Sequence, residues 1–501
     1  MTTGNVEITI LDFQGGSVVT PASSVQVVIG TCCAGSASAN SIISTRSLQT
    51  LTTQMGYGQI PEYAALAVQA GGTVLAIKAT QNAAGTASGV VSTSGNTGSS
   101  TVTVTLDGTY GAYDDYYVKL KVVAGGTRGT TGITVQVSLD AGRTYGPVLA
   151  LGTAVTLAIA NTGVTIAFGA GILVAGDTYT FATAAPTAAV AGISSALTAL
   201  QTSPYAITGW GSIHVLGTWS AADAATIQGY LNTLATGYIF TRTLLSARDA
   251  SPQSKWGGSG ESDSSWVTSL TTDYATASAK RVDVSGGFYN MPTAITNSTA
   301  GTPRYRRSGQ WAAAARQVAI PPQRHAGRVR DGALAQIVID APNDPLDGFV
   351  YHDERLNPGL DAARFTSYTT RVGLPGYYVV NPNLMSPPGS DFSLLPLGLV
   401  MDVACDIVHQ VGQLEINSDV RLNQNGTLYV NEAVSLESTL LSALNNAMTN
   451  VGMISSASVV VDQTNNVQVS KTVNIAVTIT ARGYVLQENV TIGFNNPNAA
   501  Q

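Results

Sequence analysis

The feature that most constrains the fold is a regular alternation of strand-like and helix-like segments. Residues 23–30 (SSVQVVIG) have the pattern of a core strand, residues 60–72 (IPEYAALAVQAGG) have a helical pattern with Pro61 in the first turn and glycine at the end, and residues 73–79 (TVLAIKA) are again strand-like. Three more helix–strand pairs follow between residues 193 and 288. Strands that alternate with helices predict a largely parallel sheet in an α/β layer.

Between residues 80 and 187 the pattern changes to Gly/Ser/Thr-rich stretches and short alternating runs. The segments YYVKLKVVAGG, GITVQVSLDAGRTYG and GDTYTFATAAP are separated by turn signals, and the helical period returns only at Gly192. This spacing is typical of a small β-sandwich. We predict that an all-β domain is inserted into the α/β domain and that its strands are self-contained.

The last third of the chain begins with a proline-rich, irregular stretch, after which helical patterns return in residues 398–413 and 435–452. In the second of these helices, Leu436, Leu440, Leu444 and Met448 form an apolar stripe. The predicted fold is therefore multidomain α/β and β. Its predicted parts are an N-terminal arm (1–20), an α/β core (21–79 and 188–397), an inserted sandwich-like β domain (80–187), a C-terminal α+β domain (398–480) and a C-terminal arm (481–501).

Both ends of the chain have the period-2 pattern of a half-buried strand. Near the C-terminus, residues 472–480 (TVNIAVTIT) alternate, and the pattern resumes after Arg482–Gly483. A lone strand leaves backbone donors and acceptors unpaired, so the terminal strand requires a further sheet, and the residues alone do not say to which molecule that sheet belongs. The apolar positions of the two arms are Val6, Ile8 and Ile10 at the N-terminus and Tyr484, Leu486, Val490, Ile492 and Phe494 at the C-terminus.

The composition favours self-association and excludes several classes of protein. Charged residues make up 11% of the chain, against roughly 25% in typical globular proteins, so the surface lacks the charge that keeps a monomer apart from its neighbours. The net charge of −6 argues against nucleic-acid binding. No run of 18 apolar residues predicts a membrane span, and the first residues do not have the pattern of a signal peptide. Cys32, Cys33 and Cys405 suit neither a disulfide framework nor a zinc site, and we expect buried thiols in a reducing cytosol.

Motifs for catalysis are missing from the sequence. The four histidines have no metal-ligand spacing, and we interpret His352, in YHDERLNPG, as part of a solvated charged loop. GGSGES (257–262) follows a strand and precedes a helix, but it lacks the lysine of a phosphate-binding P-loop. No nucleophile elbow or Ser–His–acid motif occurs. We predict no catalytic site, no metal, no cofactor and no enzymatic activity.

The clearest charge feature is an arginine cluster between residues 304 and 330 that contains no acidic residue before the last arginine. Aromatic residues between the arginines are few, which disfavours nucleic acid as the partner. Two interpretations stay open: an ionic interface with an acidic neighbour, or internal pairing with the acidic residues between Asp340 and Glu354. The arginines are Arg304, Arg306, Arg307, Arg316, Arg324, Arg328 and Arg330.

The order of these segments resembles the sheath protein of contractile phage tails. The stretch YHDERLNPGLDAARFTSYTTRVGLPGYYVVNPNLMSPPGSDFSLLPLGLVMDVACDIVHQVGQ (351–413) is similar to the late core segment of that family, and residues 21–58 are similar to its opening. The resemblance covers residues 21–79 and 188–495. It implies a structural subunit that polymerises as a helical sleeve around the tail tube and contracts to drive the tube through the host envelope.

The same resemblance implies how subunits join and which partners they meet. Extended N- and C-terminal arms of sheath subunits add strands to sheets in neighbouring subunits. The implied partners are other sheath subunits in helical rings, the tail tube protein, and baseplate and tail terminator proteins, in a virion tail assembled in the host cytoplasm, with no nucleic acid and no membrane insertion. Two alternatives are an extracellular adhesin or surface-array protein, and a hydrolase on an α/β core. The first would carry a secretion signal and the second a nucleophile with its base.

Overall fold

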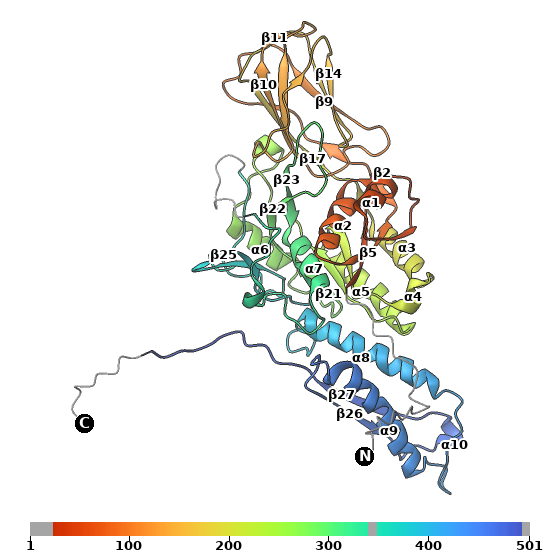
Figure 1. Ribbon diagram of the computed structural model, residues 1–501. Coiled ribbons are helices and arrows are strands. Elements are labelled where there is room, and N and C mark those ends of the chain that lie inside the picture. Colours follow the sequence, from red (N-terminus) through yellow and green to blue (C-terminus); the bar gives the residue numbers. More distant parts are fainter. Residues whose placement is uncertain (1–23, 339–347, 493–501) are drawn as a thin grey trace, which may run out of the picture. The chain divides into compact units, whose positions relative to one another are not determined.

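The computed structural model describes residues 24–338 and 348–492, which fall into two compact units (Figure 1). Unit 1 extends to Ile416 and unit 2 begins at Asn417. The N-terminal arm positions Val6, Ile8 and Ile10, and Phe494 of the C-terminal arm, lie outside the described residues.

The centre of unit 1 is a six-stranded sheet in the order β21-β20-β19-β1-β5-β3. Five neighbouring strands are parallel, and β3 joins antiparallel at the β5 edge. The parallel layer predicted from the alternating pattern is therefore present. The strands are β1 (Val25–Gly30), β3 (Ile42–Thr45), β5 (Thr73–Lys78), β19 (Ser212–Thr218), β20 (Thr243–Ser246) and β21 (Val282–Ser285).

Helices cover both faces of this sheet, which explains why its strands are apolar on both sides. On one face Val27 and Ile29 pack with the first group of helices, and on the other face Val28 packs with the second group. The first group is α3 (Val190–Gln201), α5 (Ala221–Thr236) and α6 (Asp263–Asp273); the second is α1 (Leu48–Gln54), α2 (Gln59–Gln69) and α7 (Gly309–Ala319). Ser220 caps α5 in a reciprocal capping box with Asp223, which fixes where this helix begins.

The insert is all-β and contains two main sheets, in the orders β13-β12-β10-β17-β7 and β14-β15-β9, with β8 also paired to β17. The alternation in the sequence places one face of each strand in the shared core. Its principal strands are β9 (Val102–Leu106), β10 (Tyr117–Ala124), β12 (Thr134–Ser138), β14 (Thr156–Ile159), β15 (Val164–Phe168) and β17 (Thr178–Ala184). Its short strands are β6 (Gln81–Ala83), β7 (Thr86–Ala87), β8 (Val91–Ser92), β11 (Gly126–Thr127), β13 (Leu149–Ala150), β16 (Ile172–Leu173) and β18 (Thr187–Ala188).

The insert is not self-contained, which corrects the expectation from sequence. Ala300 and Tyr305 lie in its hydrophobic core although they are distant from it in sequence. The side chain of Asn297 donates to the carbonyl of Ala160 at 2.6 Å, so the loop that carries these residues is also hydrogen-bonded to the insert. The segment around residues 297–305 therefore completes the insert.

Two hairpins and a long helix complete unit 1. The hairpins are β22 (Phe288–Pro292) with β23 (Arg304–Ser308), and β24 (Tyr368–Arg371) with β25 (Leu374–Val379). Helix α8 (Leu395–Leu414) was expected to open the C-terminal domain, but it packs in unit 1 through Leu395 and Leu399. The remaining short elements are β2 (Cys33–Ala34), β4 (Gly56–Tyr57), α4 (Tyr205–Thr208), and two 3-10 turns, η1 (Ser254–Trp256) and η2 (Val329–Asp331).

Helix α8 is the one helix of the described residues whose length and hydropathy would allow it to cross a membrane. The buried share of its most apolar 18-residue window is 56%, as in the core helix of a globular protein, so this finding is weak evidence for a span.

Unit 2 is a small α+β unit. Helix α9 (Val430–Leu444) continues into a π-helical turn, η3 (Asn445–Thr449), and packs on the two-stranded antiparallel sheet of β26 (Ser456–Val461) and β27 (Ile475–Thr480). The short helix α10 (Val467–Ser470) lies between the two strands in sequence. Strand β27 corresponds to the first alternating run predicted near the C-terminus.

Candidate assembly interface

No cluster of three or more His, Cys, Asp or Glu side chains suited to a metal ion occurs within the two described stretches of the chain. Cys32 and Cys33 are free and buried, and burial raises the pKa of each thiol to about 12, so both stay protonated near neutral pH. Glu261, in the glycine-rich loop before α6, forms an ion pair with Arg248 at 2.7 Å. A carboxylate at that position disfavours a phosphate ligand in the loop.

His352 is buried between two carboxylates, so its interpretation as part of a solvated loop is wrong. Its Nδ1 lies 3.0 Å from Asp263 and its Nε2 lies 3.1 Å from Glu354. Burial alone would lower the pKa of His352, but these two hydrogen bonds outweigh it and raise the pKa to about 9. Glu354 also accepts from the backbone of Gly359 and Asp361. The imidazolium therefore fixes the 352–361 loop to the start of α6.

Arg306 and Arg307 form the most strongly buried ion pairs of the arginine cluster. Arg306 holds Asp249 through two hydrogen bonds, at 2.6 and 2.8 Å. The Nη2 of Arg307 reaches Glu62 on α2 at 2.5 Å and Asp114 in the insert at 2.6 Å. One guanidinium from β23 thus joins the core to the inserted domain.

Burial and the neighbouring charges together shift the pKa values of Arg307 and Asp114. Burial alone would lower the pKa of Arg307, but Asp114 and Glu62 outweigh this effect and raise it. Burial, with a contribution from Glu62, raises the pKa of Asp114 well above its usual range despite Arg307. The side chain of Arg307 is 2% exposed and that of Arg306 is 3% exposed, so neither reaches a neighbouring molecule. Their assignment to an ionic interface is therefore wrong. Their acidic partners are not among the predicted residues between Asp340 and Glu354, although Arg306 also donates to the backbone carbonyl of Val350 in that region.

The other arginines of the cluster have different surroundings. Arg316 donates to backbone carbonyls, including that of Gly332 at 2.9 Å, and Arg304 lies in β23. Arg324 and Arg328 both approach Asp331, at 3.9 and 3.3 Å, and remain partly exposed. Arg330 is exposed. The 324–330 end of the cluster therefore retains exposed guanidinium groups for an ionic contact with a partner.

The C-terminal arm leaves the body of unit 2 just after β27. Arg482 donates to the carbonyl of Gly452 at 2.8 Å, and residues 483–492 form no helix or strand. Most apolar side chains of this segment lie in solvent, and Ile492 is 89% exposed. Tyr484 is half-buried, whereas Leu486, Val490 and Ile492 are exposed. Burial of these side chains would stabilise an assembled state by roughly 1.5–3 kcal/mol for each large residue.

Unit 2 also contains a sheet with room for further strands. β26 and β27 pair only with each other among the described strands, so each has an edge of backbone N–H and C=O groups without a strand partner. On one face Val461 packs against residues of the small core of unit 2. A two-stranded sheet is marginal alone and gains stability when strands are added. The chain therefore carries both an unpaired apolar segment and a receptive sheet.

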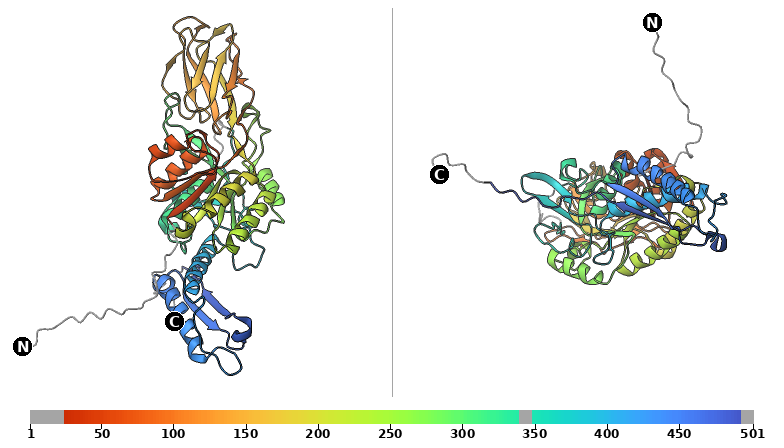
Figure 2. Two further views of the ribbon diagram at one scale, coloured as in Figure 1. Left: turned by 90° about the vertical axis from the view of Figure 1, so that its right-hand side faces the viewer. Right: turned by 90° about the horizontal axis from the view of Figure 1, so that it is seen from below.

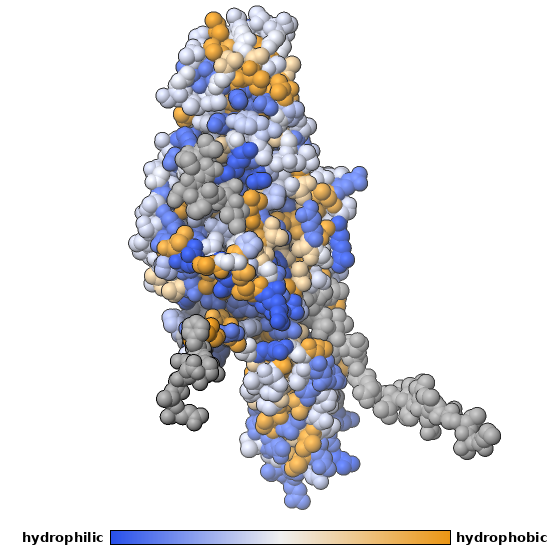
Figure 3. Space-filling view, turned by 60° about the vertical axis from the view of Figure 1, so that its left-hand side comes forward, coloured by the Kyte–Doolittle hydropathy of each residue, from blue (hydrophilic) through white to orange (hydrophobic). Residues whose placement is uncertain are grey.

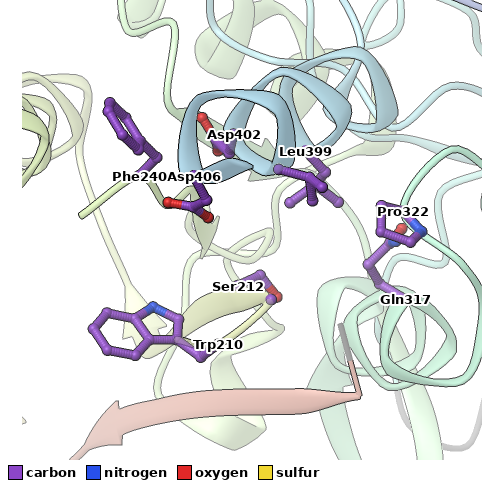
Figure 4. A pocket seen from close by; sticks show the side chains of 10 residues that line it. Trp210, Ser212, Phe240, Gln317, Pro322, Leu399, Asp402 and Asp406 are labelled. Carbon is purple, nitrogen blue, oxygen red and sulfur yellow. The ribbon is translucent and has the colours of Figure 1, made fainter. Parts of the chain in front are cut away.

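A small cavity of about 20 Å³ lies beside α8 (Figure 4). Figure 4 shows Asp406 pointing from α8 toward Trp210 and Ser212. Asp402, one turn earlier, is held by Arg242 and Arg281 at 3.0 Å each. Burial and the neighbouring Asp402 raise the pKa of Asp406 to about 7. The cavity is too small for an organic ligand, but Asp406 also lines a larger groove.

Exposed hydrophobic residues are frequent on unit 1. Figure 3 shows orange residues interrupting the hydrophilic surface of the core on the side that is turned forward there. Among the described residues of unit 1, the large apolar side chains with more than half of their surface exposed are Val148, Ile207, Tyr238, Leu356, Val372, Leu414 and Ile416. Such exposure in a chain with little charge favours contact with other molecules.

Sequence reasoning missed several of these residues. Glu62 and Asp114, the acidic partners of Arg307, and Asp249, the partner of Arg306, lie far from these arginines in sequence, and no local pattern connects them. Ile207 lies in the four-residue helix α4 and Val372 in a two-residue turn, and in such short elements one apolar residue carries no periodic signal. A signal was available for the hairpin that carries Val372, because RVGLPG has the composition of a tight turn.

Comparison with solved structures identifies the class of fold. The sheath of an extracellular contractile injection system (PVC), in its contracted state, is similar over 98% of both chains, with a TM-score of 0.52 and 9% identity. A sheath tail protein from Desulfitobacterium hafniense scores 0.46 with 12% identity, covering 95% of this chain and 100% of that one. A chain of the anti-feeding prophage (AFP) baseplate scores 0.37 with 10% identity, covering 62% of this chain and 76% of that one.

The fold is thus that of a contractile-system sheath subunit, as the resemblance predicted. More particularly, the chain belongs to the family described as DUF2586, N-terminal domain, whose model matches residues 3–383. The search of curated proteins found no match.

Proposed function

We propose that this chain is the subunit of a contractile sheath: it polymerises as a helical sleeve around a tube, and contraction of the sleeve drives the tube through a target envelope. The observation that carries the proposal is the fold likeness to the PVC sheath over nearly the whole of both chains. Its partners would be neighbouring sheath subunits, the tube protein, and baseplate and terminator proteins. The setting we favour is a phage tail assembled in the host cytoplasm.

The proposed joint between subunits is strand addition. The exposed apolar segment 484–492 of one subunit would pair with the free edges of β26 and β27 in another, so that backbone hydrogen bonds supply affinity and alternate side chains supply specificity. The N-terminal arm, with Val6, Ile8 and Ile10, would do the same. The exposed arginines near residue 330 would add an ionic contact. The inserted β domain would lie outside the common framework as a spacer or surface-binding module.

Electron microscopy of the purified chain tests this proposal. We expect hollow tubes or stacked rings from the full chain, and only monomers from a chain truncated after Thr480. The matched control is Val148→Asp, which changes an exposed valine of the insert and should leave assembly intact. If the full chain stays monomeric at concentrations that favour polymers, the sheath proposal is wrong. An adhesin or surface-array role would gain support if the full chain formed flat lattices instead.

A further inference from the structure

The two most exposed large apolar side chains of the described part of unit 1 are Val372 and Ile207, each 88% exposed. Val372 lies at the tip of the β24–β25 hairpin and Ile207 in α4. Figure 1 shows the hairpin projecting from one side of the core and α4 on the opposite side, and the view from below in Figure 2 agrees. A protruding apolar side chain on one side of a subunit and an exposed apolar surface on the opposite side are the arrangement that a head-to-tail contact requires.

The hairpin is a rigid knob. Arg371 pairs with Leu374, which leaves a two-residue turn of Val372 and Gly373, and Gly373 has a φ of 80°, which favours glycine. The base of the hairpin is anchored in the core by buried tyrosines. Asp353 accepts from the backbone of Thr370 at 3.1 Å, which holds the strand that leads to the tip. A pre-ordered tip loses little conformational entropy on binding.

Ile207 lines a groove of about 640 Å³ on the opposite side of unit 1. One wall is apolar and includes Tyr238, whose ring stacks on His409 of α8 at 4.0 Å between centroids. Tyr238 has a φ of 61°, an unusual backbone conformation for a bulky residue, so a strained turn presents its ring at the groove. The lining residues that bear on a contact are Ile207, Tyr238, Asp406 and His409.

The charges of the knob and the groove are complementary. Arg371 beside the tip is exposed and forms no ion pair with the described residues; its guanidinium lies only over the ring of Tyr378, at 5.8 Å. The groove contains one carboxylate, Asp406, on its polar wall. A cation entering the groove would favour the ionised form of this side chain.

We propose that the β24–β25 hairpin of one copy of this chain inserts into the α4–α8 groove of the next copy, with Val372 against Ile207 and Tyr238 and with Arg371 beside Asp406. Because the two surfaces differ and lie on opposite sides, the contact is heterologous, and its repetition generates rings or helices. The inference rests on the proposed sheath function, to which it adds a second contact besides the arms.

Cysteine cross-linking tests the contact. In a Cys405→Ser background, the pair Val372→Cys and Ile207→Cys should form disulfide-linked multimers on mild oxidation, whereas the control pair Val148→Cys and Ile207→Cys should not. Tubes that form without cross-linking would overturn the knob-and-groove contact and leave the sheath function standing. Cross-linked multimers without tubes or rings would support the contact and overturn the sheath function.

A double-mutant cycle gives a second measurement that does not depend on cysteine geometry. Arg371→Ala and Asp406→Asn should each raise the critical concentration for assembly about threefold to tenfold, and the double variant should raise it no further than the single ones. Additive effects of the two substitutions would show that Arg371 and Asp406 do not interact and would overturn the contact. Arg371→Lys should restore most of the assembly lost in Arg371→Ala.

Discussion

Two regions of the molecule differ in where their side chains lie. One is the junction between the insert and the core, and the other is the C-terminal arm. At the junction, Arg307 is buried among carboxylates that come from two distant parts of the same chain. In the arm, large apolar side chains such as Ile492 remain in solvent. A region that satisfies its polar groups internally supports the fold of the subunit, whereas a region that leaves apolar groups exposed is suited to a partner. The predictions below test this contrast through the free energy of unfolding of the monomer.

Arg307→Met should have the largest effect. Removing the guanidinium leaves Glu62 and Asp114 buried without a cation, and breaking such a pair typically costs about 3–5 kcal/mol. Urea unfolding at pH 7 measures the loss. Arg330→Met, at an exposed arginine of the same cluster, is the control and should change stability by less than about 0.5 kcal/mol. Equal effects of the two substitutions would remove the contrast between the junction and the surface.

Asp283→Asn should stabilise the subunit at alkaline pH. Burial raises the pKa of Asp283 to about 7, from 3.8 for an exposed aspartate. The stability that the protonated form provides is complete below pH 4 and is lost as the pH rises through 7. At pH 8 the variant should therefore exceed the parent by about 2–4 kcal/mol. The difference in the free energy of unfolding between the variant and the parent should shrink at pH 5. A parent that is more stable than the variant at both pH values would contradict the raised pKa of Asp283.

His352→Gln should destabilise the subunit by about 2–3 kcal/mol near pH 6. The pKa of His352 is raised to about 9 by Asp263 and Glu354, so the contribution of the imidazolium is complete below pH 6.5 and is lost as the pH rises through 9. Thermal unfolding at pH 6 and pH 10 measures the change. The pKa of His409 is lowered instead, so His409→Gln is the control and should lack this loss at high pH.

Val490→Asp with Ile492→Asp should have the smallest effect on the monomer, within about 0.5 kcal/mol, because both side chains already lie in solvent. The same double substitution should abolish assembly, since each carboxylate would occupy a position that must be dry in a docked strand. Denaturant unfolding and light scattering of one preparation measure the two properties. A large fall in monomer stability would show that the arm belongs to its own subunit.

The sequence contained enough information for the parallel sheet and for most of its helices. Strand β5 begins at its predicted residue, and α2 begins one residue before its predicted start, because buried strands and capped helices have local patterns. The completion of the insert by Ala300 and Tyr305 had no such pattern, since a contact between distant segments depends on tertiary packing. For the same reason, seven arginines in sequence could not be divided into buried and exposed ones.

The burial of Arg307 has a mechanical consequence. The insert is tied to the core by its two chain connections, by the guanidinium that bridges Glu62 and Asp114, and by the loop that carries Asn297. Attachments at several separate points oppose swinging of the insert, so the insert would follow any rotation of the core. Torque that acts on the insert would therefore pass directly into β23 and α2, and the insert would behave as a lever arm.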